Sequence, residues 1–182
     1  EMQHAMARSP HLNLMVRDPR LNRVINVPNS VRNSYQPVRK NTWGPLLWNT
    51  MHSFGRVLKD IENPENREIL TRDTSSLFDS LLRTIPCPSC RNHALEYKRR
   101  HKVGNGNSSR DAFETWAYTF HNEVNKRIQH VMISREQANK THSSHEPIES
   151  LREYLRSINS HLRPGVNPGE LLKRAIAIIE KS

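Results

Sequence analysis

The chain has 182 residues, and its 28 Lys or Arg residues against 18 Asp or Glu residues give a formal net charge of +10. The length is sufficient for one domain with a sizeable core and extensions. No apolar run approaches the roughly 18 residues that a transmembrane helix needs, and residues 1–20 lack the apolar stretch of a secretory signal. We therefore expect a soluble protein without a membrane span. The positive charge favours an acidic partner, such as nucleic acid, an anionic membrane or a phosphate-bearing cofactor, without requiring any of them.

Residues 1–40 form a polar, basic segment with prolines at positions 10, 19, 28 and 37. Prolines at this frequency prevent a long helix, because each lacks the amide hydrogen that a helix interior needs. We expect an irregular N-terminal arm with extended stretches or short strands, serving oligomer contacts or partner docking.

The next segment, residues 41–133, begins with the spacing of two helices. Apolar residues recur at intervals of three and four over 42–61, which predicts an amphipathic helix. Asn63 and Pro64 then form an N-cap and a first-turn proline for a second helix, which continues to the break at Ile85-Pro86.

Two further helices are expected in the same segment. Cys87 begins the third, which runs to the glycine-containing loop over 103–109. Ser109 or Asp111 can cap the fourth, whose apolar stripe continues to Ile128 and Val131. Four helices in one segment suggest a bundle.

The remaining segment, 134–182, is expected to be a helical extension. Its first part, 134–146, is polar and predicts a loop or short turn. Two amphipathic helices are expected over 147–160 and 168–181, separated by the breaker RPGVNPG. The predicted class is therefore all-α: a four-helix bundle with an irregular arm before it and additional helices after it.

The two cysteines of the chain are spaced Cys87-Pro88-Ser89-Cys90. Cysteines at i and i+3 in a first helical turn can close a disulfide, and the unpaired amides and the positive dipole end there favour a thiolate. A lowered thiol pKa makes a cysteine a better leaving group in thiol–disulfide exchange. Two alternatives stay open, namely a structural disulfide and half of a zinc site in which His93 and another histidine complete the ligands.

Polar and aromatic residues recur on the flanking helices. Trp48 and His52 share one face of the first helix, and His121 and Asn125 share one face of the fourth. Asparagine is unusual inside a helix, since its side chain competes for backbone hydrogen bonds. Trp and His can stack on a planar heteroaromatic ring, and the following Lys126 can meet a pyrophosphate.

The order of these residues resembles the Erv/ALR sulfhydryl oxidase family. The resemblance covers roughly residues 40–133 and is closest to the compact versions encoded by large DNA viruses. It rests on three blocks: Gly44-x3-Trp48-x3-His52, Cys87-x-x-Cys90 and Trp116-x4-His121-Asn122-x-Val124-Asn125.

The resemblance implies a four-helix bundle that holds FAD noncovalently, without a metal, as a homodimer. Cys90 would lie against the isoalloxazine ring, and Cys87 would exchange with a protein dithiol substrate. Electrons would pass to molecular oxygen and give hydrogen peroxide. The resemblance implies cofactor contacts at Gly44, Trp48, His52, Tyr118, His121, Asn122, Asn125 and Lys126.

The chain departs from many family members, because it has no cysteine left for a second structural disulfide or a shuttle pair. The single pair must therefore serve both substrate and cofactor, unless another protein relays the thiols. The expected location is the host cytoplasm, a viral factory or the virion. The alternative function is a basic zinc-binding helical module that contacts nucleic acid or protein partners.

Overall fold

The structure is a computed structural model that describes residues 15–18, 23–26, 39–103 and 109–182. It divides the chain into two units, Glu1–Gln36 and Pro37–Ser182. The first unit holds an antiparallel pair of strands, β1 (Met15–Asp18) and β2 (Arg23–Asn26). These strands lie in the arm, where the sequence predicts extended stretches or short strands, while the four prolines of that arm lie outside the described residues.

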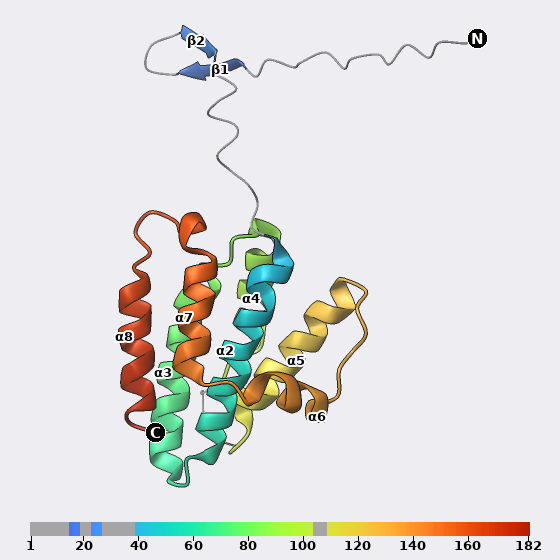
Figure 1. Cartoon of the computed structure of the whole chain (residues 1–182), viewed down its shortest axis with the longest axis vertical. Helices are drawn as coiled ribbons and strands as arrows, with labels where there is room; N and C mark the ends of the chain where they lie inside the picture. Colours follow the sequence, from blue (N-terminus) through green and yellow to red (C-terminus); the bar gives the residue numbers. More distant parts are fainter. Residues whose placement is uncertain (1–14, 19–22, 27–38, 104–108) are drawn as a thin grey trace, which may run out of the picture. The chain divides into compact units, whose positions relative to one another are not determined.

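The second unit is built from helices (Figure 1), and the predicted all-α class is confirmed. Helix α7 lies beside α2, and α8 lies beside α3 and α7. No helix in the described ranges is long and apolar enough to cross a membrane. The elements are α2 (Lys40–Asp60), α3 (Pro64–Leu82), α4 (Pro88–Arg100), α5 (Ala112–Arg127), α6 (Arg135–Ala138), the π-helical turn η1 (Asn139–Ser143), α7 (Pro147–Ser157), the 3-10 turn η2 (Asn159–His161) and α8 (Pro168–Ile179).

The helix starts follow local signals in the sequence. The Asn63 side chain accepts hydrogen bonds from the amides of Glu65 and Asn66 at 3.0 and 3.1 Å, which caps α3. Asn167 caps α8 in the same way. Four of the helices begin with proline, whose missing amide hydrogen costs nothing in a first turn.

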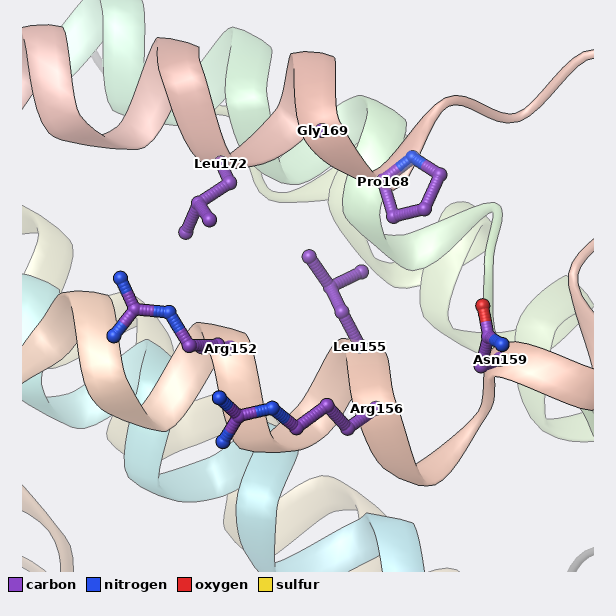
Figure 2. A pocket seen from close by; sticks show the side chains of 7 residues that line it. All are labelled: Arg152, Leu155, Arg156, Asn159, Pro168, Gly169 and Leu172. Atoms are coloured by element: carbon purple, nitrogen blue, oxygen red, sulfur yellow. The ribbon is translucent and has the colours of Figure 1, made fainter.

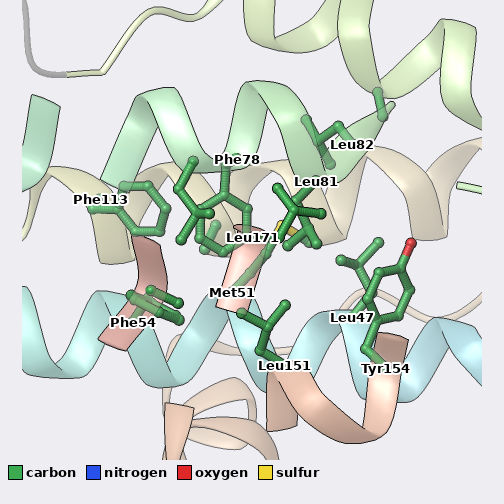
Figure 3. Close-up of a cluster of buried hydrophobic side chains, with 14 of the residues drawn as sticks. Leu47, Met51, Phe54, Phe78, Leu81, Leu82, Phe113, Leu151, Tyr154 and Leu171 are labelled. Carbon is green, nitrogen blue, oxygen red and sulfur yellow. The ribbon is translucent and has the colours of Figure 1, made fainter. Parts of the chain in front are cut away.

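The core of the second unit is shared by the bundle and the C-terminal helices. Phe54 of α2 and Phe78 of α3 pack edge to face with ring centroids 5.7 Å apart. Figure 3 shows Leu151 and Tyr154 of α7 in the same cluster, and both are fully buried. Each such side chain contributes roughly 1.5–3 kcal/mol through burial. Helices α7 and α8 therefore belong to the same compact unit as the bundle, whereas the division into domains 1–40, 41–133 and 134–182 stays a prediction.

Helices α2 and α5 cross at a glycine. A Cβ atom on Gly55 would lie 2.9 Å from the Cα atom of Glu114, which is closer than side chains tolerate. Glu114 is buried, and its carboxylate pairs with the ammonium group of Lys59 at 3.0 Å. The absence of a side chain at Gly55 thus sets how closely the two helices approach.

The end of α5 corrects the sequence prediction. The helix stops at Arg127, so the expectation that its buried stripe continues to Ile128 and Val131 is wrong. Ile128 is 47% exposed and Val131 is 86% exposed.

The backbone after α5 explains this early stop. Gln129 has a φ of 58°, in the left-handed region that no continuing helix allows. Its amide donates to the Lys126 carbonyl at 3.2 Å, and the His130 amide donates to the Asn125 carbonyl at 2.8 Å. This pair of bonds is a Schellman motif, which commonly ends a helix but usually has glycine at the left-handed position.

The segment after residue 133 is more helical than the predicted loop or short turn. Ser134 accepts a hydrogen bond from the Gln137 amide, and the Gln137 side chain accepts one from the Ser134 amide. This capping box starts α6, which continues directly into η1. The pattern Ser-x-x-Gln was a readable signal for this helix start.

Helix α7 is hydrogen-bonded to the segment that precedes the cysteines. The Thr84 hydroxyl donates to the Leu81 carbonyl at 2.7 Å, so the Tyr154 hydroxyl, 3.0 Å away, is the donor to Thr84. Both residues are buried. The C-terminal segment therefore supports the chain three residues before Cys87.

We expect Tyr154→Phe to lower the free energy of unfolding by about 1 kcal/mol, because the ring stays packed while a buried hydrogen bond is lost. Urea unfolding followed by circular dichroism measures this change. Thr84→Val alone and the double variant complete a mutant cycle. If the two effects simply add, the hydroxyls do not interact and the link is absent.

Candidate active site

Cys87 and Cys90 form a disulfide at the start of α4. Cys87 is the N-cap residue: its sulfur accepts a hydrogen bond from the Cys90 amide at 3.2 Å, and its carbonyl accepts one from the Arg91 amide at 2.9 Å. The prediction that Cys87 begins this helix is confirmed. In the reduced pair, the same amide and the positive end of the helix favour a thiolate on Cys87.

The segment from residue 84 to residue 90, here called the redox turn, is fixed on two sides. The buried Arg91 guanidinium donates to the Ile85 carbonyl at 2.8 Å, which ties the turn to α4. Thr84 is bonded to α7 as described above. The backbone that carries the disulfide is therefore hydrogen-bonded to both α4 and α7.

An aromatic cluster connects α4 with α2 and α5. The rings of Trp48 and His121 are stacked, with centroids 4.0 Å apart and planes 7° apart. Trp48 also meets Phe120 edge to face at 5.3 Å. The ring centroids of Phe120 and His93 are 6.2 Å apart, and His93 follows Cys90 by one helical turn. The redox turn and the paired Trp and His rings thus belong to one continuous set of contacts.

Three histidines meet behind this cluster. His52 Nε2 and His121 Nδ1 are 3.2 Å apart, and the ring of His142 from η1 lies 5.2 Å from each of their rings. The Nδ1 atom of His142 is 2.7 Å from the Asn49 side-chain oxygen. The sequence singled out His52 and His121 but not His142, which stands alone in a polar stretch. Only the capping box at Ser134 indicated that this stretch folds into helix.

Burial keeps all three histidines neutral. Desolvation and the neighbouring imidazoles lower the pKa of His52 and of His121 to about 3, and they lower the pKa of His142 to about 4. A neutral imidazole offers one donor and one acceptor. His52 Nδ1 and Trp116 Nε1 are buried without a hydrogen-bond partner among the described residues. Such atoms cost about 1–3 kcal/mol each unless a bound group satisfies them.

A pocket of about 540 Å³ opens beside the histidines. His121 and His142 line it together with Asn125 and the segment that follows α5. These two imidazole rings and the Asn125 amide side chain, beside a largely apolar wall, fit a flat heteroaromatic cofactor. The donor set therefore agrees with the flavin nucleotide that the sequence resemblance implies.

Two predicted cofactor residues hold the backbone in this structure. The Asn122 amide donates to the Ile133 carbonyl at 2.9 Å, and its oxygen accepts from the Ile133 amide at 3.0 Å. Asn125 donates to the Val131 carbonyl at 3.3 Å. Both asparagines thus fix the return of the chain after α5, and Asn125 also lines the pocket.

Three other predicted residues lie apart from the aromatic cluster. Tyr118 packs beneath the guanidinium of Arg135, 5.5 Å from the ring centroid. Lys126 is exposed. A Cβ on Gly44 would meet no atom of a described packing neighbour within 4 Å, so no other described part of the protein approaches this residue closely.

The zinc alternative finds no support in the described part of the chain. No group of three or more His, Cys, Asp or Glu residues there could hold a metal ion, and both cysteines are bonded to each other. A further pocket of about 400 Å³ between α7 and α8 (Figure 2) is lined by Arg152, Arg156, Asn159 and otherwise apolar residues. It contains no cysteine, histidine or aromatic residue and so offers no redox chemistry.

The buried histidines predict a loss of stability in acid. Because their pKa values are lowered from 6.5 in the folded state, the unfolded chain binds more protons below pH about 6.5. Their contribution to the free energy of unfolding is complete above that pH and is lost progressively as the pH falls toward about 3. Urea unfolding at several pH values between 7 and 5 measures the slope of the free energy of unfolding against pH. His142→Gln should make it shallower, whereas His161→Gln, outside the cluster, should leave it unchanged. An unaltered slope in His142→Gln would contradict the assignment.

Comparison with known proteins identifies the region that contains these residues. The Erv1 / Alr family model matches residues 45–144, more than half of the chain. Two proteins of African swine fever virus, from isolates of Kenya and Malawi, are named FAD-linked sulfhydryl oxidase. Each is 32% identical over 92 residues, which cover 50% of this chain and 72% of the relative. A protein of invertebrate iridescent virus 6 is 28% identical over 103 residues, covering 54% of this chain and 89% of the relative.

No solved structure matches the chain. The family match extends beyond residue 133, where the sequence resemblance ended, and it includes η1 and His142. The redox turn, the aromatic cluster and the three histidines all lie inside the matched range, and this chain therefore belongs to the Erv1/Alr family.

Proposed function

We propose that the chain is a FAD-dependent thiol oxidase that forms disulfides in protein substrates and uses molecular oxygen as the final acceptor, giving hydrogen peroxide. The observation that carries this proposal is the Cys87–Cys90 disulfide at the start of α4, one turn from a His93 ring that contacts the aromatic cluster. Family membership and the names of the viral relatives support the cofactor and the reaction class.

Trp48, His52, His121 and Asn125 are the residues that we assign to the cofactor, and the geometry adds His142 to them. Gly44, Tyr118, Asn122 and Lys126 stay predictions from the resemblance. When bound, FAD supplies a two-electron acceptor for the dithiol form of the cysteine pair and the route from that dithiol to oxygen. The protein contributes planar faces, neutral donors and acceptors, and exclusion of water.

The exchange with substrate takes place on the chain's own sulfurs. A substrate thiolate attacks the Cys87 sulfur, the Cys87–Cys90 bond breaks, and Cys90 leaves as a thiolate. The second substrate thiolate then attacks the substrate sulfur of the mixed disulfide, and Cys87 leaves as a thiolate. The substrate loses two electrons and the cysteine pair gains them. The Cys90 amide, which bonds to the Cys87 sulfur at 3.2 Å, stabilises that second leaving group.

The rotation of α4 supports this division of labour. At about 100° per residue, Cys90 lies within about 60° of His93 and Tyr97 around the helix. His93 contacts Phe120, and the Tyr97 hydroxyl donates to Thr119, so this side of α4 faces α5. Cys90 is therefore the cysteine turned toward the aromatic cluster, and Cys87 is left for the substrate.

We expect purified protein to carry a flavin absorbance, and we expect the variants Cys87→Ser and Cys90→Ser to keep it. Their rate of oxygen consumption with a dithiol should fall by about two orders of magnitude or more. The flavin stays because neither sulfur belongs to the aromatic cluster. An oxygen electrode and a visible spectrum measure the two effects.

The two variants also separate the roles of the cysteines. When it is mixed with the disulfide form of a substrate peptide, Cys90→Ser should accumulate a mixed disulfide through Cys87, whose thiolate attacks the peptide disulfide and releases one peptide thiolate. Mass spectrometry detects this species, and Cys87→Ser should trap far less of it. Native oxygen consumption in Cys90→Ser would refute the mechanism. Trapping in Cys87→Ser alone would reverse the assignment.

The oligomeric state and the setting stay predictions. A homodimer is expected from the resemblance, and sedimentation of the flavin-loaded protein would measure it. The named relatives are viral proteins, which supports a viral source for this chain and a viral factory or virion as its place of action.

A further inference from the structure

A basic groove of about 450 Å³ lies between α3 and α4, outside the aromatic cluster and the histidines. Four cationic side chains line it, those of Arg83, Lys98, Arg99 and Lys102, against the single carboxylate of Asp79. The remaining lining is small or apolar. The groove is therefore strongly positive, and nothing in the proposed chemistry uses it.

The charges of the groove are only partly compensated. Lys98, whose side chain is 11% exposed, pairs with Asp79 at 3.0 Å and donates to Ser75 at 3.1 Å. These contacts fix the Lys98 ammonium group in the wall of the groove. Arg83 and Lys102 are exposed and form no ion pair with other described residues. Two cations thus remain available to an anionic ligand.

The groove lies on the Cys87 side of α4. Cys87 and Lys98 are eleven positions apart, which places them within about 20° of each other around the helix and about 16 Å apart along its axis. By the same geometry, Cys90 is about 80° from Lys98 and about 20° from Tyr97 around the helix, so it lies nearer the side of α4 that faces α5. Arg83, at the other wall, is the last residue before the redox turn. The cationic groove therefore lies along the side of α4 that carries Cys87, with Lys98 about 16 Å from Cys87 along the helix axis.

We propose that this basic groove binds acidic segments flanking the cysteines of client proteins, so that the enzyme prefers acidic dithiol substrates. The inference rests on the proposed thiol oxidase function and adds the substrate class. An extended chain spans about 3.3 Å per residue, so carboxylates within about five residues of a client cysteine reach Lys98 while that cysteine meets Cys87.

The lining favours an acidic peptide over nucleic acid. It contains no aromatic side chain on which a base could stack. Leu95 gives the groove an apolar wall that suits the side chains between carboxylates. The groove also lies on the Cys87 side of α4, which suits a ligand that must bring a thiol to Cys87.

The test uses the full-length, flavin-loaded protein and three substrates: dithiothreitol and two dithiol peptides. The peptides share one sequence except that glutamates within about five residues of each cysteine in the first are glutamines in the second. We expect a KM about fivefold lower for the acidic peptide at low salt, with similar kcat. The difference should shrink at high ionic strength, since exposed charges are screened.

The variant Arg83→Gln/Lys102→Gln should remove the advantage of the acidic peptide and leave dithiothreitol oxidation unchanged, which also reports that the protein is folded. The matched control is Lys173→Gln/Lys181→Gln, which removes two exposed cations from and just after α8 and should keep the advantage. Equal loss in both variants would overturn the groove as the site, since net charge alone would then explain it.

The remaining outcomes separate the two proposals. Equal KM values for both peptides, with dithiothreitol still oxidised, would overturn the acidic-client inference and leave the oxidase function in place. No oxidation of dithiothreitol by the flavin-loaded protein would overturn both. A single-stranded oligonucleotide that binds the groove variant less well than the native protein, without any preference among the peptides, would assign the groove to nucleic acid instead.

Discussion

The first turn of α4 is the constraint around which the rest of the site is arranged. Because the chain enters this helix at Cys87 and closes the disulfide to Cys90, both sulfurs lie at the positive end of a helix dipole. The disulfide is therefore held at the N-terminal end of α4. Thr84 links the turn to α7, and Arg91 links it to α4 itself.

The second requirement is a region that stays uncharged while containing many polar atoms. His52, His121 and His142 meet from α2, α5 and η1, and burial keeps them neutral. The approach of α2 to α5 at Gly55 sets the spacing of two of these helices. A neutral, rigid set of rings beside a redox-active disulfide can bind a flat ligand without adding charge of its own, so that the ligand's electronic properties are set mainly by hydrogen bonds and stacking.

Local signals predicted much of this arrangement, and long-range contacts account for what was missed. Asn63-Pro64 and the cysteine pair determine where α3 and α4 begin, and each signal is complete within a few residues. The left-handed Gln129 has no such signal, because glycine is the residue expected there. The return of His142 onto α2 depends on contacts between residues 93 positions apart, namely Asn49 and His142, which no local pattern encodes.

The hydrogen bond between Tyr154 and Thr84 has a consequence for the order in which the protein is made. Synthesis runs from the N-terminus, so the redox turn leaves the ribosome well before α7 does. Until residue 154 has emerged, Thr84 lacks this buried partner and the core lacks Leu151 and Tyr154. The support of the disulfide is thus completed only after α7 has been synthesised, and until then the cysteines lie in a chain whose core is unfinished.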